Sequence, residues 1–191
     1  MPRQVDHEER RRRIADAVCL LIDERGLEAA TLRDVAARAE VSMGAVQRCF
    51  RTKEEMLRFA LAHIGARITG RVRARPVGDV QDAGGALAHA VTEVALLREE
   101  HRAEARIWLA FVARAAVNPA LAEVLRAGYE EFEQVLLRLL AEAGAGAPRR
   151  EARTLLALAD GLTAQVLVGR LGAGEAEELL LGQVARAVEG R

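Results

Sequence analysis

The sequence predicts an all-α fold of about nine helices, with an N-terminal three-helix helix-turn-helix domain followed by a C-terminal helical bundle. The 191 residues include only four prolines, one tryptophan, one tyrosine and four phenylalanines. Ala, Leu, Arg and Glu, which favour helices, are abundant, and no strand-like alternation persists. We expect a flexible tail over residues 1–7, the smaller domain over 8–68 and the bundle over 69–191.

The first predicted helix runs from about residue 8 to residue 25. Ile14 and Val18 belong to its apolar face, and Gly26 ends it in the manner of a residue just past a helix C-terminus. The arginine run at 10–13 has two open interpretations. It is either a solvated face or an extension of a phosphate-binding surface.

Residues 31–50 predict a helix-turn-helix, because two short helical patterns flank a tight turn at 39–41. Thr31 and Ser42 stand where N-caps of the two helices are expected. The polar positions of the second helix suit a recognition helix that enters a DNA major groove. The candidate DNA-binding residues are Arg33, Ser42, Met43, Gly44, Ala45, Gln47, Arg48 and Lys53.

Each of four of these residues has a specific expected role. Gly44 has no side chain, so backbone can approach the duplex closely. Gln47 could pair with adenine, and Arg48 with guanine or a phosphate. Lys53, in the first turn of the next helix, is a point charge suited to a phosphate.

Residues 13–57 resemble the DNA-binding domain of the TetR family of transcriptional regulators. The matching residues are Ile14, Ala17, Gly26-Leu27, Thr31-Leu32, Val35-Ala36, Val41-Ser42-Met43-Gly44-Ala45-Val46, Phe50 and Lys53-Glu54-Glu55-Met56-Leu57. Gln47 departs from the family pattern, which usually has a phosphate-binding tyrosine there, and Cys49 stands where histidine is usual. The resemblance implies a homodimer with a DNA-binding head and a ligand-responsive body.

The body is expected to contain further helices in succession. The fourth helix begins near Lys53 and continues to about Arg73, and Pro76, Gly78, Gly84 and Gly85 mark a break after it. Later helices are predicted over residues 87–97, 102–117, 119–143, 149–171 and 175–188. Asn118-Pro119 provides an N-cap followed by proline at the first helical position.

The segment 149–171 has two apolar stripes, so it must be covered on two sides. Segment 149–171 and the last helix, each contributed by two copies of the chain, would form a four-helix dimer interface. Alternatively, one of the two stripes covers a larger monomer core. The candidate interface residues are Leu155, Leu158, Ala159, Leu162, Val166, Leu180, Val184 and Val188.

The middle helices contain four of the aromatic residues, which the family resemblance suggests border a ligand cavity. Ordinary core packing is the alternative for each of them. The candidate ligand-binding residues are His101, Arg106, Trp108, Phe111, Tyr129, Phe132 and Gln165.

Charge is unevenly distributed although the whole chain is formally neutral. Residues 1–75 contain 16 basic and 11 acidic residues, a net charge of +5, so the remainder carries −5. A basic N-terminal part suits a protein that presents one end to phosphates. The acidic remainder would suit a cationic effector, but a solvated surface explains it equally well.

Several protein classes are not expected. Cys19 and Cys49 are too few for a disulfide framework, the charged N-terminus does not read as a secretory signal, and no apolar run is long enough for a membrane span. We therefore expect a cytoplasmic protein. No metal, cofactor or catalytic arrangement is recognisable, so an enzyme is not expected. Cys49 is either a packed thiol or a redox switch in the DNA-facing domain.

Together these patterns predict a homodimeric transcriptional regulator, specifically a repressor released from a palindromic double-stranded DNA operator by a small-molecule effector. Two alternatives remain open. One is a regulator that binds DNA without ligand control, and the other is a helical protein-interaction module that no longer reads DNA. The marked preference for Arg over Lys suggests a bacterium with a GC-rich genome.

Overall fold

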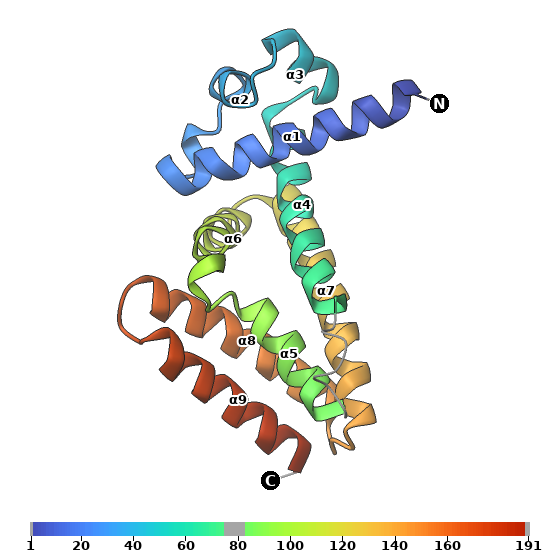
Figure 1. Ribbon diagram of the computed structural model, residues 1–191, viewed down its shortest axis with the longest axis vertical. Coiled ribbons are helices and arrows are strands. Elements are labelled where there is room, and N and C mark those ends of the chain that lie inside the picture. Colours follow the sequence, from blue (N-terminus) through green and yellow to red (C-terminus); the bar gives the residue numbers. More distant parts are fainter. Residues whose placement is uncertain (1, 75–82, 190–191) are drawn as a thin grey trace. The chain divides into compact units, whose positions relative to one another are not determined.

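The computed structural model describes residues 2–74 and 83–189, and its regular secondary structure over these residues is helical. The α-helices are α1 (Pro2–Arg25), α2 (Leu32–Arg38), α3 (Met43–Cys49), α4 (Lys53–Arg73), α5 (Ala83–Ala95), α6 (Arg102–Ala115), α7 (Pro119–Glu142), α8 (Pro148–Leu167) and α9 (Ala173–Glu189) (Figure 1). Two short 3-10 helices are η1 (Leu27–Ala29) and η2 (Glu99–His101). For the described part of the chain, the predicted all-α class and the expectation of about nine helices are confirmed.

The chain divides into two compact units, each built from segments that are distant in sequence. Unit 1 combines the residues up to Gly65 with Arg106–Arg126, and unit 2 combines Ala66–Ala105 with the residues from Ala127 onward. Helices α4, α6 and α7 therefore contribute to both units. The sequence does not reveal that Arg106–Arg126 belong to the same unit as the N-terminal residues. The domain boundaries expected at residues 8 and 68 stay predictions.

In unit 1, helix α1 packs against α2 and α3. Ile14 and Val18 are fully buried in this contact region, as the apolar face of the helix predicted. The helix begins at Pro2, earlier than the start expected near residue 8. Proline is well tolerated in a first helical turn, where its missing N–H would have no intrahelical partner, and no later residue of the segment 1–7 breaks the helix.

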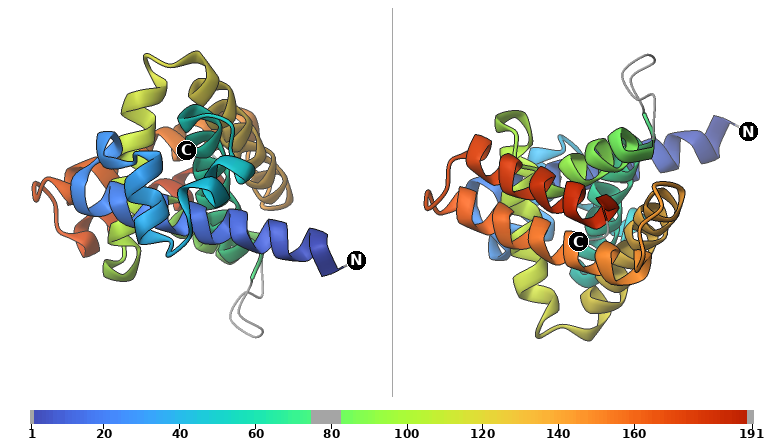
Figure 2. Two further views of the ribbon diagram at one scale, coloured as in Figure 1. Left: turned by 90° about the horizontal axis from the view of Figure 1, so that it is seen from above. Right: turned by 90° about the horizontal axis from the view of Figure 1, so that it is seen from below.

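In unit 2, helices α5, α8 and α9 pack against one another, and the views in Figures 1 and 2 show α8 and α9 side by side. The buried Thr163 hydroxyl lies 2.5 Å from the Ala95 carbonyl oxygen and 2.8 Å from that of Ala159. The core of this unit also contains most residues expected at a dimer interface: Leu155, Ala159, Leu162, Val166, Leu180 and Val184.

That burial corrects the predicted interface. The six side chains are covered by unit 2 itself, so they are not available to a second copy of the chain. Leu158 and Val188 are half-buried and remain partly accessible. The apolar stripe that the sequence assigned to a partner is therefore the stripe that covers the monomer core, which was the alternative interpretation.

Helix ends agree with the local signals in some places and differ in others. Asn118 caps α7, because its Oδ1 accepts a hydrogen bond from the Leu121 N–H at 3.0 Å. Gly84 and Gly85 lie in the first turn of α5 rather than in a break, whereas Pro76 and Gly78 fall outside the described residues. Helix α8 ends at Leu167, earlier than expected, because the chain turns at Gly169, where φ is +74°.

Across the ranges described, no helix is both long enough and apolar enough to cross a lipid bilayer.

Candidate nucleic-acid interface

Helices α2 and α3 form the expected helix-turn-helix, and both N-caps are confirmed. The Thr31 Oγ1 accepts from the Asp34 N–H at 3.2 Å, and the Ser42 Oγ accepts from the Ala45 N–H at 3.1 Å. Between the helices, Glu40 adopts φ 53°, and the Val41 N–H donates to the Ala36 carbonyl at 3.0 Å. This backbone bond closes the turn and fixes the direction in which α3 leaves it.

Helix α3 has one buried and one exposed face. Ser42, Met43, Gln47 and Arg48 are exposed, and Met43 keeps 49% of its surface accessible although it is apolar. Arg33 is exposed on α2. These side chains can therefore reach a partner without rearrangement of the helix-turn-helix.

Ala45, also a candidate contact, is 9% exposed and packs in the domain core. Its backbone N–H is occupied by the Ser42 hydroxyl. The assignment of Ala45 to the binding surface is therefore corrected. Gly44 is half-buried, and a methyl group placed on it would meet Arg48 only at 3.6 Å, so glycine is not required there by the packing of the domain itself.

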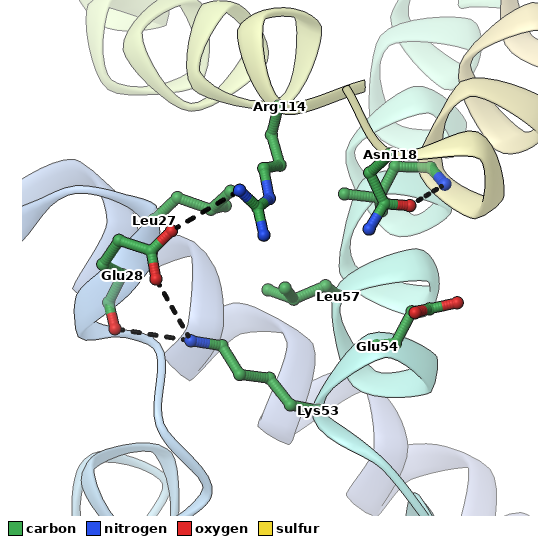
Figure 3. Close-up of a pocket in the computed structure, with 8 residues that line it drawn as sticks. Leu27, Glu28, Lys53, Glu54, Leu57, Arg114 and Asn118 are labelled. Atoms are coloured by element: carbon green, nitrogen blue, oxygen red, sulfur yellow. Dashed lines mark hydrogen bonds and ion pairs between the residues drawn. The ribbon is translucent and has the colours of Figure 1, made fainter. Parts of the chain in front are cut away.

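Lys53 lies in the first turn of α4, but its side chain is turned toward η1. Its Nζ is 3.4 Å from the carbonyl oxygen of Glu28 and 4.0 Å from the carboxylate of the same residue (Figure 3). Lys53 is thus already engaged in the absence of DNA.

The start of α4 is also stabilised by Thr52 and Glu55, which sequence analysis missed. The Thr52 hydroxyl accepts from the Glu55 N–H at 3.0 Å, and the Glu55 carboxylate accepts from the Arg51 N–H at 2.9 Å. The Thr-x-x-Glu spacing typical of a capping box could have identified this pair.

The arginine run of α1 has intramolecular partners. The Arg11 guanidinium lies over the rings of Phe50 and Phe59, 4.9 Å and 4.4 Å from their centroids, and the two rings are 5.4 Å apart. Arg13 pairs with Glu40 at 3.4 Å in an exposed contact. Arg11 therefore fastens α1 to the end of α3 and the start of α4, a role that neither interpretation of the run anticipated.

Cys49 is 6% exposed, on the inner face of α3. Burial raises the pKa of its thiol, while the positive charges of Arg10, Arg11 and Arg48 act in the opposite direction. A raised pKa keeps the thiol in its unreactive protonated form. This environment favours the packed-thiol interpretation over a redox switch.

The candidate ligand residues are distributed over both units, and their common role stays a prediction. In unit 1, Trp108 and Phe111 are buried, and the Arg106 Nε donates to the Asp23 carboxylate at 2.5 Å. In unit 2, Phe132 is buried, the Tyr129 hydroxyl donates to Asp160, and Gln165 accepts from Arg170. His101 is buried, and its Nδ1 has no hydrogen-bond partner among the residues that the structure describes.

A buried network of charges in unit 2 was not predicted. The carboxylates of Glu93 and Glu104 both bind Arg71 from α4, at 2.9 Å and 2.7 Å. Arg98 approaches Glu93 at 3.0 Å, and Arg67 approaches Glu104 at 2.7 Å. The Glu93 and Glu104 side chains are only 4% and 10% exposed, so this ion network joins α4, α5 and α6 inside the unit.

No group of His, Cys, Asp and Glu side chains suited to holding a metal ion occurs within the portion of the chain that the structure describes.

Comparison with known proteins identifies two family matches, one over the helix-turn-helix region and one over the C-terminal helices. Residues 14–59 match the model of the tetR family of bacterial regulatory proteins, and residues 83–189 match the C-terminal domain of BetI-type transcriptional repressors. The chain is 32% identical over 172 residues to PksA of Bacillus subtilis strain 168, an HTH-type transcriptional regulator, covering 88% of this chain and 83% of PksA.

Two further similarities extend over most of the chain. HdnoR of Paenarthrobacter nicotinovorans, an HTH-type nicotine-responsive transcriptional repressor, is 30% identical over 166 residues, with 82% of this chain and 83% of HdnoR covered. The crystal structure of a transcriptional regulator from Rhodococcus sp. Rha1 matches with a TM-score of 0.85 at 33% identity. That match covers 94% of this chain and 96% of the Rhodococcus chain.

Proposed function

Since this chain belongs to the TetR family and is a DNA-binding transcriptional repressor with a BetI-type C-terminal domain, we propose that it acts as a homodimer whose two α3 helices read the half-sites of a palindromic operator. The observation that carries the proposal is the α3 helix itself. It is capped by Ser42, anchored by its buried face and exposes its polar side chains. As its partner is bacterial DNA, we place the repressor in the cytoplasm.

The exposed residues divide into base-reading and phosphate-binding groups. Ser42, at the N-cap of α3, and Gln47 and Arg48 on α3 are exposed and are assigned to base edges, whereas Arg33 and Lys53 are suited to the flanking phosphates. Lys53 must exchange Glu28 for a phosphate when it does so. Gln47 supplies a hydrogen-bonding amide at the position where the family usually has tyrosine.

The dimer interface is assigned to the outward faces of α8 and α9 in place of the buried stripe. On α8, Ala157 and Gly161 are exposed and Leu158 is half-buried. On α9, Leu181 is 38% exposed and Ala185 is also exposed. Small and apolar residues on two adjacent helices allow the close approach that a four-helix interface needs.

A small-molecule effector bound by the body releases the repressor from DNA. The relative HdnoR is nicotine-responsive, which supports an organic effector for this chain as well. The effector must bind the two states of the repressor unequally, and a coupling of about 5- to 150-fold in DNA affinity is ordinary for such regulation.

Selection of bound sequences from random duplex DNA tests the proposal. The full chain should enrich a two-fold symmetric site, and Gln47→Ala should change the preferred bases. Gln134→Ala, an exposed glutamine of unit 2, is the matched control and should leave the site unchanged. A folded protein that enriches no sequence would favour the interaction-module alternative.

The release of DNA by an effector is tested with the DNA sequence obtained from the selection. Compounds that raise the melting temperature are added to the protein–DNA complex, because a true effector stabilises the state that it binds. Loss of DNA binding on saturation supports release by an effector. If stabilising compounds leave operator affinity unchanged, the ligand-independent alternative holds.

A further inference from the structure

A second binding site is suggested by a cavity inside unit 1, beside the start of α4. Its volume is about 320 Å³. Figure 3 shows that η1, α4, α6 and the start of α7 surround it. Leu57 and Leu121, which are 7% and 1% exposed, form an apolar part of its lining together with Leu27. Apolar walls with a few convergent polar groups are typical of small-molecule sites.

Two cations meet a single carboxylate in this cavity. The Lys53 Nζ and the Arg114 Nη1 each lie 4.0 Å from an oxygen of Glu28, on opposite sides of that carboxylate (Figure 3). At this distance neither pair forms a hydrogen bond through the carboxylate. The Glu28 side chain is 82% exposed, so it can leave for water at little cost.

Asn118 adds a third polar group. Its Oδ1 is used to cap α7 through the Leu121 N–H, and this contact turns the amide nitrogen of the same side chain toward the cavity (Figure 3). Glu54, the other acidic residue of the lining, points away from the space between Lys53 and Arg114 (Figure 3). When the Glu28 side chain swings out, the polar side chains that face this space are therefore donors and cations, while the Glu28 carbonyl oxygen remains a partner of Lys53 (Figure 3).

We propose that the cavity binds a small amphipathic carboxylate. Its carboxylate takes the place of the Glu28 carboxylate between Lys53 and Arg114, and its apolar part lies against the leucines. The exchange of one carboxylate for another leaves the charge of the site unchanged. The ammonium and guanidinium groups can form charge-assisted hydrogen bonds to the ligand that they do not form to the Glu28 carboxylate, which is 4.0 Å from each of them.

The site has a regulatory consequence that rests on the proposed function. Lys53 is the residue assigned to a DNA phosphate, and it cannot bind the ligand and the phosphate with the same geometry. The carboxylate and the operator therefore compete, and by linkage each lowers the affinity of the other by the same factor. This ligand would act beside the DNA-binding domain.

Isothermal titration calorimetry on the full chain without DNA tests the site directly. Phenylacetate and hexanoate serve as aromatic and aliphatic probes, and phenylethanol and phenylethylamine are neutral and cationic controls of similar shape. We expect at least one carboxylate to bind and both controls to bind at least about tenfold more weakly, because they cannot replace Glu28. No binding by either carboxylate, or equal binding by the controls, overturns the proposal.

Variants locate the binding. Lys53→Met and Arg114→Met should each lower the affinity for the carboxylate probe by about tenfold, since each removes one charge-assisted contact. Glu28→Gln should raise this affinity, because the Glu28 carboxylate no longer competes for the site. Arg126→Met, an exposed arginine of α7 outside the cavity, is the matched control. Melting curves verify that all four fold. If the Lys53 and Arg114 variants bind like the Arg126 variant, the ligand lies elsewhere and the proposal fails.

Fluorescence anisotropy with selected duplex DNA tests the competition. The carboxylate should weaken DNA binding by the parent protein and have no effect on Lys53→Met. Carboxylate binding without any effect on DNA affinity overturns the competition between ligand and operator. Because the calorimetry contains no DNA, a protein that fails to bind DNA refutes the proposed function while the cavity is still tested independently.

Discussion

Replacing Arg11 by methionine separates the two possible roles of the arginine run. Methionine keeps an unbranched stem but removes the guanidinium that lies 4.9 Å and 4.4 Å from the ring centroids of Phe50 and Phe59. Each cation–ring contact contributes about 0.5–1 kcal/mol at a partly exposed site. With two rings the expected loss is about 1–2 kcal/mol, which for a chain of this length lowers Tm by roughly 2–8 °C.

The assay combines thermal unfolding with a salt titration of DNA binding. Arg11→Met should lower Tm and leave the dependence of DNA affinity on salt unchanged, because Arg11 is occupied by the rings rather than by a phosphate. Arg12→Met, at an exposed position of the same run, is the control and should not change Tm. If Arg11→Met melts like Arg12→Met and reduces the salt slope by about 1, Arg11 is a phosphate ligand and the packing argument is refuted.

Three other substitutions or modifications have defined outcomes. Ser42→Ala removes the α3 cap and should cost about 1 kcal/mol in unfolding free energy, and an unchanged denaturation midpoint would exclude a contribution from the cap. Cys49 should resist alkylation in the folded protein at neutral pH and react faster as pH rises, because the raised pKa of its thiol leaves little thiolate. Rapid labelling at neutral pH, measured by mass spectrometry, would contradict this. Gly161→Glu should convert the proposed dimer to monomers in sedimentation experiments. Monomer stability should not fall, since a Cβ atom placed at Gly161 meets none of the described residues within 4 Å, and an intact dimer would place the interface elsewhere.

The elements with strong local signals were predictable from the sequence. Thr31 and Ser42 were recognised as caps because capping depends on residues only a few positions apart. Helix α4 spans Lys53–Arg73 as expected, since neither proline nor a turn sequence interrupts its apolar period. The exposed face of helix α3 follows from the same periodicity, and Val46, on its other face, is fully buried.

The parts that depend on distant partners were not predictable. Helix α8 has two apolar stripes, and periodicity alone does not determine which one faces α5 and α9, so Leu155 and Leu162 were assigned to the wrong side. The contacts of Lys53 with Glu28 and of Arg11 with Phe59 join segments that come together only in the folded chain. In a run of like charges such as residues 10–13, the sequence does not indicate which side chain will contact another part of the folded chain.

The buried ion network of unit 2 limits how the end of α4 can move against α5. Apolar surfaces can slide by small amounts with a gradual change in energy, but Arg71 fits Glu93 and Glu104 in one register only. Intermediate positions would pull Arg71 away from the buried Glu93 and Glu104 carboxylates and leave Glu93 with Arg98 as its remaining arginine partner, which is unfavourable. We therefore expect the end of α4 to adopt few discrete positions relative to α5. A higher effector concentration should then change the fraction of molecules in each position and not the positions themselves.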